Sequence, residues 1–179
     1  RALALVRYGT VLRTQARLGD ARNAIDEAVQ VLGKMRDEGD QSETTLVGLA
    51  LGISTQARIA SSINDESGAL AISARAVETI RPLATGPSPS APLRRTFGEV
   101  MNMHGFLQAR NRQEAAVASL EEARSAYRAI DELRMNDLAS AAGFAESSSW
   151  LVQAYRQFGR NEEAKRAGRE ALDVAAKVL

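Results

Sequence analysis

The sequence predicts an all-α fold built from stacked helix pairs, and three observations support that prediction. Apolar residues recur at three-to-four-residue spacing, as Leu3 and Val6 do, and no segment alternates with period two over the length of a strand. Valine and isoleucine are scattered singly among alanines, which favours helix over sheet. One phrase of sequence occurs four times at intervals of 45, 47 and 48 residues, which is typical of a helical array.

Each copy of the phrase starts with Gly or Asn, continues through a short polar segment and contains two alanines. The copies start at Gly19, Asn64, Asn111 and Gly159, and they are aligned on Ala24, Ala69, Ala116 and Ala164, with further alanines at Ala28, Ala76, Ala123 and Ala171. Small residues at these places let paired helices approach closely, since larger side chains there would overpack the contact. We therefore expect one helix to end at the Gly or Asn and the next to begin just after it.

This pattern predicts eight helices. Their expected ranges are 2–18, 20–36, 43–62, 66–81, 93–110, 112–133, 137–158 and 160–178. Asp20 and Asp65 are expected to cap second helices, and Glu162 and Glu163 suit a helix N-terminus. All four prolines lie between Pro82 and Pro92, so a loop at 83–92 is expected to divide the chain into two halves.

Composition limits the classes of function. The 179 residues include 23 Lys and Arg against 22 Asp and Glu, so we expect no nucleic-acid partner. The absence of cysteine excludes disulfides and thiolate chemistry, and no apolar run is long enough to span a bilayer. We expect a cytoplasmic location, or a periplasmic one if the chain belongs to a membrane receptor. Because the sequence opens on Arg1 in a helical pattern, we also expect a piece of a larger protein.

The last copy resembles a tetratricopeptide repeat, a helix-turn-helix unit with small residues at fixed places. The matching residues are Leu151, Tyr155, Gly159, Ala164 and Ala171, and the first copy fits more weakly with Tyr8, Val11, Gly19, Ala24 and Val31. The period exceeds the family's value of about 34 residues. The resemblance implies a right-handed α-α superhelix forming one domain over residues 1–179. Its repeats would be about 2–38, 43–82, 93–134 and 137–179. The long units also resemble the regulatory regions of bacterial serine/threonine kinases and transcription activators.

The sequence offers little for catalysis. His104 is the single histidine, and we expect its ring to pack between repeats. Adjacent acids such as Glu121 and Glu122 diverge around a helix, so we expect no metal site and no cofactor. The serines at 147–149 lack the glycines of a nucleophile elbow. We therefore expect a protein that is not an enzyme.

Six aromatic residues fall on predicted first helices: Phe97, Phe106, Phe144, Trp150, Tyr155 and Phe158. Aromatic side chains at helical spacing usually pack in a core, which is the favoured interpretation. The alternative is that some of them line a binding groove, and Phe144 and Trp150 are the two assigned least readily to the core.

Arginine placement suggests a binding surface. In a superhelix of this family the first helices line the concave face, and the segment 2–18 carries Arg7, Arg13 and Arg17 without any acid. Arg13 and Arg58 lie eleven residues before Ala24 and Ala69, so we expect them to occupy equivalent positions. The hypothesis is an acidic or carboxylate-bearing ligand in the groove, and its candidate residues are Arg13, Arg17, Arg58, Asn102, Gln108, Gln153 and Arg156. The alternative is that these arginines only solvate alanine-rich helices.

The expected function is therefore protein or peptide recognition by a non-catalytic scaffold. The alternative is a regulatory or ligand-sensing domain of a larger bacterial signalling protein, acting through movement at 83–92. Apolar residues continue along the last helix to Val178 and Leu179, although terminal repeats normally present a polar outer face. Either more chain follows, or this last helix associates with a second copy.

Overall fold

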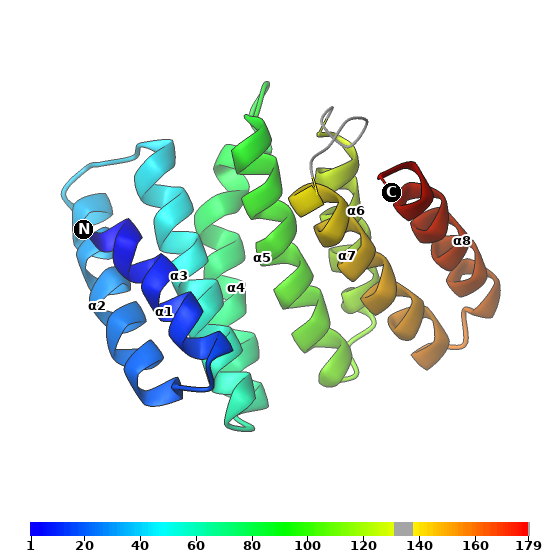
Figure 1. Cartoon of the computed structure of the whole chain (residues 1–179), viewed down its shortest axis with the longest axis horizontal. Coiled ribbons are helices and arrows are strands. Elements are labelled where there is room, and N and C mark those ends of the chain that lie inside the picture. Colours follow the sequence, from blue (N-terminus) through cyan, green and yellow to red (C-terminus); the bar gives the residue numbers. More distant parts are fainter. Residues whose placement is uncertain (131–137, 179) are drawn as a thin grey trace. The chain divides into compact units, whose positions relative to one another are not determined.

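A computed structural model describes residues 1–130 and 138–178, and every regular element in those ranges is an α-helix (Figure 1). The all-α prediction is confirmed for this part of the chain. The helices are α1 (Ala2–Thr14), α2 (Leu18–Asp37), α3 (Glu43–Ser62), α4 (Glu66–Ala84), α5 (Ala91–Arg110), α6 (Ala115–Arg128), α7 (Leu138–Gln157) and α8 (Asn161–Val178). The predicted boundaries at 133, 134 and 137, and Leu179, lie outside the described residues.

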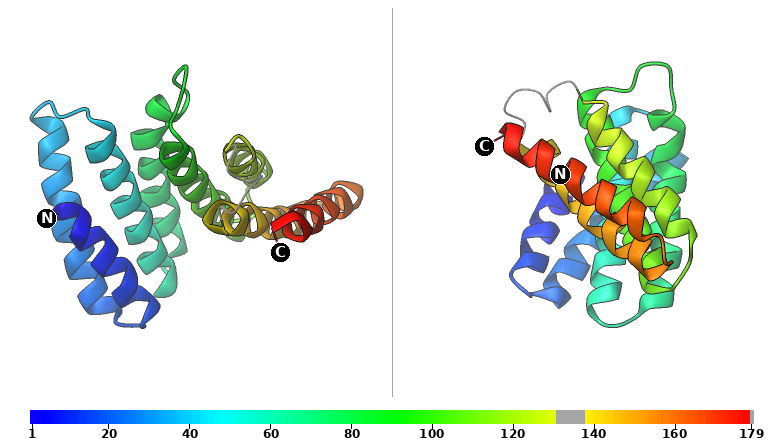
Figure 2. Two further views of the ribbon diagram at one scale, coloured as in Figure 1. Left: turned by 45° about the horizontal axis from the view of Figure 1, so that its top comes forward. Right: turned by 90° about the vertical axis from the view of Figure 1, so that its right-hand side faces the viewer.

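The chain forms two compact units, Arg1–Pro87 and Ser88–Leu179, and the division falls inside the predicted proline-rich loop. The described residues of the first unit form α1 to α4 and those of the second form α5 to α8, and within each unit the helices lie side by side (Figure 2). In the first unit each helix packs on its neighbour along the chain, and α1 also touches α3. The second unit repeats this set of neighbours with α5 to α8, where α5 also touches α7.

All four helix pairs turn through the same backbone geometry. One residue in each turn adopts a left-handed conformation: Ala16, Asn64, Arg112 and Gly159, with φ of 60°, 62°, 55° and 75°. The next residue donates its N–H to the carbonyl five residues earlier, in the bonds Arg17 to Leu12, Asp65 to Ala60, Gln113 to Gln108 and Arg160 to Tyr155, at 2.8–3.0 Å. This is the Schellman ending of a helix, in which the left-handed residue lets the chain reverse while the last carbonyls keep donors.

The turn positions correct the alignment of the first copy. Measured between the left-handed residues, the pairs repeat every 48, 48 and 47 residues. The residue equivalent to Ala69 is therefore Ala21, not Ala24, and both Ala21 and Ala69 donate N–H bonds of 2.9 Å across the first helical turn, to Arg17 and Asp65. Gly19, at which the repeated phrase predicts the end of a helix, lies in the first turn of α2.

Several helix ends also differ from the predictions. α1 ends at Thr14 instead of 18, and α6 begins at Ala115 instead of 112. α4 continues through Pro82 to Ala84, because a proline near the end of a helix removes one hydrogen bond only shortly before the helix stops. α5 begins two residues early at Ala91, since Pro92 suits a first helical turn.

The predicted caps are right at one of two positions. The Asp65 carboxylate caps α4 by accepting the N–H of Gly68 at 3.0 Å. Asp20 caps nothing, since the residue at the N-cap of α2 is Arg17. Asp20 instead lies in the first turn of α2, where it accepts hydrogen bonds from Arg17 at 2.6 and 2.9 Å.

Small residues set the distance between helices, as the alanine pattern predicted. Of the eight alanines, Ala24, Ala28, Ala69, Ala76, Ala116, Ala123 and Ala164 are buried, and Ala171 is half-buried. Glycines on the first helix of a pair add a second set of close contacts. In α3, Gly48 lies against Leu32 of α2, and at the equivalent place in the other unit Gly143 of α7 lies against Tyr127 of α6.

The aromatic residues mostly pack in the second unit. Phe144 is 1% exposed, which contradicts the expectation that it would be one of the two aromatic residues least suited to the core. Trp150 is half-buried and packs its ring against that of Phe106, with centroids 4.5 Å apart. Both Trp150 and Phe158 border the cluster formed by residues of α6, α7 and α8, so the core interpretation holds for them.

Candidate functional site

The three predicted arginines of the first unit have different environments. Arg17 is exposed at the turn and is paired with Asp20. Arg13 and Arg58 are both half-buried, on α1 and α3 respectively. Arg17 was expected to project from the first helix beside Arg13, but it lies beyond the end of that helix and is neutralised locally.

The expected equivalence of Arg13 and Arg58 is wrong. The N–H groups of Ala16 and Gly159 donate to the carbonyls of Arg13 and Arg156, so those two arginines occupy the same place in their turns. The residue of α3 at this place is Ser61, three residues after Arg58. The error follows from the shifted alignment of the first copy, because a displacement of three residues moves a side chain about 4.5 Å along the helix, to the next turn.

The predicted residues of the second unit divide into buried and exposed pairs. Asn102 and Gln108 are buried on α5, and the Gln108 carbonyl oxygen accepts the hydroxyl of Ser119 on α6 at 2.7 Å. Gln108 therefore joins α5 to α6 through its side-chain carbonyl. Gln153 and Arg156 are exposed on α7.

The first unit has a groove with α2 and α4 as its walls and α3 as its floor. Its volume is about 440 Å³, and its lining residues are Arg36, Gln41, Leu46, Ile53, Arg75, Glu78, Thr79, Pro82 and Leu83. A neighbouring hollow of about 480 Å³ shares Arg36, Ile53 and Arg75 and extends along α2 past Lys34. The floor is apolar and the rim carries charges, which is the usual composition of a site for a peptide side chain.

One cation of this groove is available to a ligand. Arg36 donates two hydrogen bonds to Asp37 at 2.7 and 2.9 Å, and Lys34 lies 3.7 Å from Glu38. Arg75 is exposed on α4, and it forms no ion pair within residues 1–130 and 138–178. A guanidinium without a carboxylate partner beside an apolar floor favours an acidic ligand, because its donors match a carboxylate bidentately.

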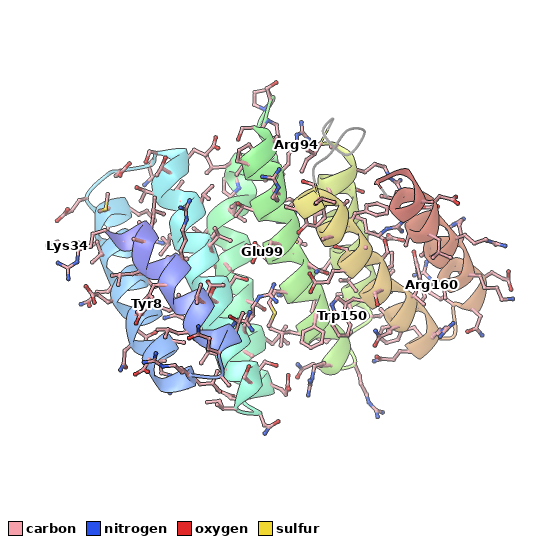
Figure 3. All side chains as sticks on the ribbon, in the orientation of Figure 1. Tyr8, Lys34, Arg94, Glu99, Trp150 and Arg160 are labelled. Atoms are coloured by element: carbon pink, nitrogen blue, oxygen red, sulfur yellow. The ribbon has the colours of Figure 1, made fainter. Side chains whose placement is uncertain are left out.

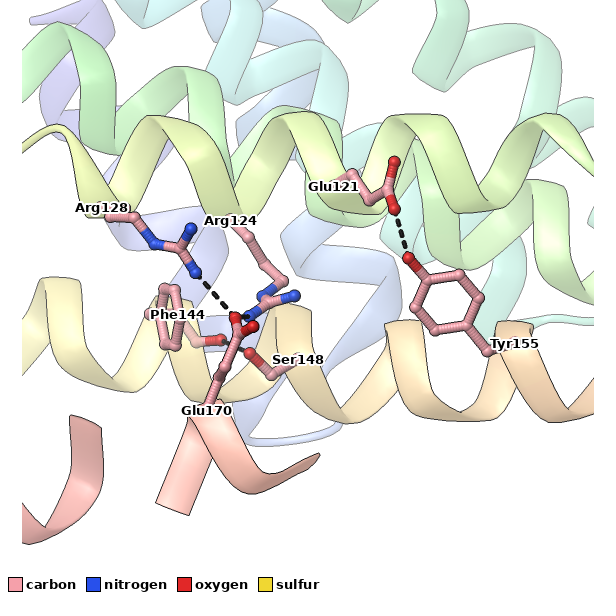
Figure 4. Close-up of polar contacts among 7 residues, drawn as sticks. All are labelled: Glu121, Arg124, Arg128, Phe144, Ser148, Tyr155 and Glu170. Atoms are coloured by element: carbon pink, nitrogen blue, oxygen red, sulfur yellow. Dashed lines mark hydrogen bonds and ion pairs between the residues drawn. The ribbon is translucent and has the colours of Figure 1, made fainter. Parts of the chain in front are cut away.

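The second unit has a comparable hollow of about 430 Å³ between α6, α7 and α8, where Arg124, Arg128 and Glu163 are in ion pairs and Arg166 is exposed. Figure 4 shows Arg124 and Arg128 of α6 converging on Glu170 of α8, with hydrogen bonds of 2.6 and 2.9 Å to one carboxylate oxygen. Both guanidinium groups lie over the ring of Phe144, at 5.0 and 5.6 Å from its centroid. The two arginines thus make cation–π contacts with Phe144 and hydrogen bonds with Glu170.

The pKa values in this hollow reflect the pairing. Burial alone would raise the pKa of the Glu170 carboxyl group, but the hydrogen bonds and charges of Arg124 and Arg128 outweigh burial and lower it. Burial, together with a hydrogen bond to Glu121, raises the pKa of Tyr155 to about 12. In the hollow of the second unit, Glu170 therefore joins α8 to the two arginines of α6, whereas Arg75 in the groove of the first unit lies beside an apolar floor.

The sequence analysis missed this groove because its charged residues come from second helices. The predicted binding surface lay on first helices, whereas Arg36 and Arg75 lie on α2 and α4. A signal was present, since Arg75 follows the buried Ala69 by six residues and lies on an exposed face of α4.

His104 is half-buried on α5, and no group of three His, Asp or Glu side chains in residues 1–130 and 138–178 could hold a metal ion. None of the described helices combines the length and the apolar character that crossing a membrane requires. In comparisons with known proteins, no family model, curated protein or solved structure matches this chain.

Proposed function

We propose that the chain is a non-catalytic scaffold of long-period tetratricopeptide-like pairs, and that it binds an acidic protein or peptide. The observation that carries this proposal is the groove of the first unit, where the exposed Arg75 lies beside Leu46, Ile53 and Leu83. The shared turn geometry of the four pairs supports a repeat array. In the proposal the pairs wind as a right-handed superhelix, as they do in that family.

The ligand expected in this groove has a defined chemistry. A carboxylate would bind the Arg75 guanidinium, and an aliphatic side chain next to it would cover the apolar floor. Glu78 lies on the same wall, so an acidic ligand must approach the arginine side of the groove. The helices that form the groove are already in place, and a preformed site keeps the entropic cost of binding low.

A peptide library displayed on phage tests the proposal with the intact chain. We expect selected sequences to join Asp or Glu to a neighbouring aliphatic residue. For a synthetic peptide of that class, Arg75→Glu should weaken binding by about tenfold or more, the usual value of a charge-assisted hydrogen bond. Arg22→Glu, at an exposed position of α2 outside the groove, is the control and should bind as the original chain does. Selection of sequences without acids, or equal binding by Arg75→Glu, would contradict the proposal.

A second function is favoured by the division of the chain at Pro87 and Ser88. Two compact units joined at a proline-rich segment suit a ligand-sensing or regulatory domain in a larger bacterial signalling protein, such as a serine/threonine kinase or transcription activator. This alternative predicts a small molecule that raises the melting temperature of the chain, since a ligand that binds only the folded state stabilises it. A library of metabolites screened by thermal shift checks it, and the proposal fails if no compound raises the melting temperature.

A further inference from the structure

Helices α1 and α8 expose large apolar side chains. On α1, Tyr8 is 54% exposed and Val11 is 51% exposed, with Ala4 exposed on the same helix face (Figure 3 labels Tyr8). On α8, Leu172 is 71% exposed. Exposed apolar residues at i, i+4 and i+7 make a continuous stripe, and such a stripe normally packs against another helix.

The turn positions show which residues of α3 are equivalent to the exposed apolar residues of α1. The first and second left-handed residues are 48 positions apart, so Ala4, Tyr8 and Val11 correspond to Gly52, Gln56 and Ile59 of α3. Two of these residues contact α2, and the third is buried. A Cβ on Gly52 would lie 2.7 Å from Val29 of α2, the Gln56 amide donates to Asp26 of α2 at 2.6 Å, and Ile59 is buried. The open face of α1 is thus the face by which α3 packs on α2.

The same comparison identifies the face of α8. The first and fourth left-handed residues are 143 positions apart, so Val29 and Asp26 of α2 correspond to Leu172 and Arg169 of α8. Leu172 and Arg169 are both exposed. Helix α8 therefore presents to solvent the two positions that, in α2, receive the next helix of the chain.

We propose that copies of this chain associate head to tail, with α8 of one copy packed on α1 of the next. The contact repeats the α2–α3 interface between molecules. Leu172 takes the place of Val29 and covers Ala4, a residue almost as small as Gly52. Arg169 takes the place of Asp26 and lies over the Tyr8 ring, so a cation–π contact replaces the hydrogen bond between Asp26 and Gln56. Because the two faces differ, the contact is heterologous, and each copy keeps one free face for a further copy until a ring closes.

Blocking each face separately tests this arrangement by sedimentation analysis. The original chain should rise in average mass with concentration, starting from 19.2 kDa. Val11→Glu blocks the α1 face and Leu172→Glu blocks the α8 face, and each variant alone should remain monomeric. An equimolar mixture of the two should reach twice the monomer mass and stop there, since one intact α8 face then meets one intact α1 face.

The control applies the same change outside both faces. Ile63 is 49% exposed at the turn after α3, and Ile63→Glu should associate as the original chain does. Circular dichroism of each variant verifies that its helices are intact. A monomeric original chain at high concentration overturns the proposal, and so does a mixture that stays monomeric. Continued self-association of Leu172→Glu would also overturn it, because that outcome requires a symmetric contact.

Discussion

The packing of Tyr127 allows a specific prediction about stability, because its ring lies between two glycines. The ring is 3% exposed and comes from α6, while Gly98 of α5 lies on one side of it and Gly143 of α7 lies on the other. A Cβ on Gly98 would be 2.7 Å and 2.8 Å from two ring carbons, whereas carbon atoms normally pack at about 3.5–4.0 Å. The ring has no room to move away, since Gly143 approaches the other edge of the ring as closely as Gly98 approaches the first.

The Gly98→Ala variant should therefore be destabilised despite the better helix propensity of alanine. Overpacking a well-filled core costs about 1–3 kcal/mol, and the propensity gain is about 1 kcal/mol. We place this variant near the upper end of that range, with a net loss of about 2 kcal/mol. Gly168→Ala on α8 is the matched control, because its Cβ would lie 3.8 Å from Val152, an ordinary contact. That variant should gain up to about 1 kcal/mol.

Urea unfolding followed by circular dichroism measures the difference between the two variants, expected at about 3 kcal/mol in the free energy of unfolding. A double-mutant cycle with Tyr127→Leu gives a second readout. Gly98→Ala should cost less in the Tyr127→Leu background, because the far edge of the ring is then absent. If Gly98→Ala proves as stable as Gly168→Ala, the glycines do not set the distance between these helices and the packing argument is wrong.

Two further predictions concern the turns and the charge-paired hollow. Ala16→Gly should stabilise the chain by about 1 kcal/mol, because a left-handed conformation strains alanine but not glycine. For the same reason, Gly159→Ala should destabilise the chain by a similar amount. Thermal unfolding measures both changes, and a melting temperature equal to that of the original chain in both variants would refute this reasoning. The raised pKa of Tyr155 predicts a contribution to stability that is fully present below pH 10 and is lost as the pH rises towards 12. Tyr155→Phe should remove that part of the alkaline loss of stability, and an unchanged pH profile would contradict it.

The sequence by itself determined the helical class, the number of described helices and the break between the two units. The three signals were the absence of alternating polarity, the recurring alanines and the confinement of the prolines to 82–92. Each of these signals acts through the backbone or through short-range packing. The residues that cap α3, α4 and α5 are Ser42, Asp65 and Ser90, and the hydroxyl or carboxylate of each accepts a backbone N–H near a helix start. Such signals are local, so a single sequence carries them.

The tertiary structure alone decided the register of the first pair and the location of the open groove. Ala16 takes the left-handed turn although Gly19 is better suited to it, since Leu12 and Ala21 on either side are buried and fix where α1 must end. Arg36 and Arg75 are 39 residues apart, and only the packing of α2 and α4 around α3 places both on one groove. A contact between distant segments depends on the helix rotations and positions that packing selects, and a three-residue shift moves a side chain about 4.5 Å along the helix, to the next turn.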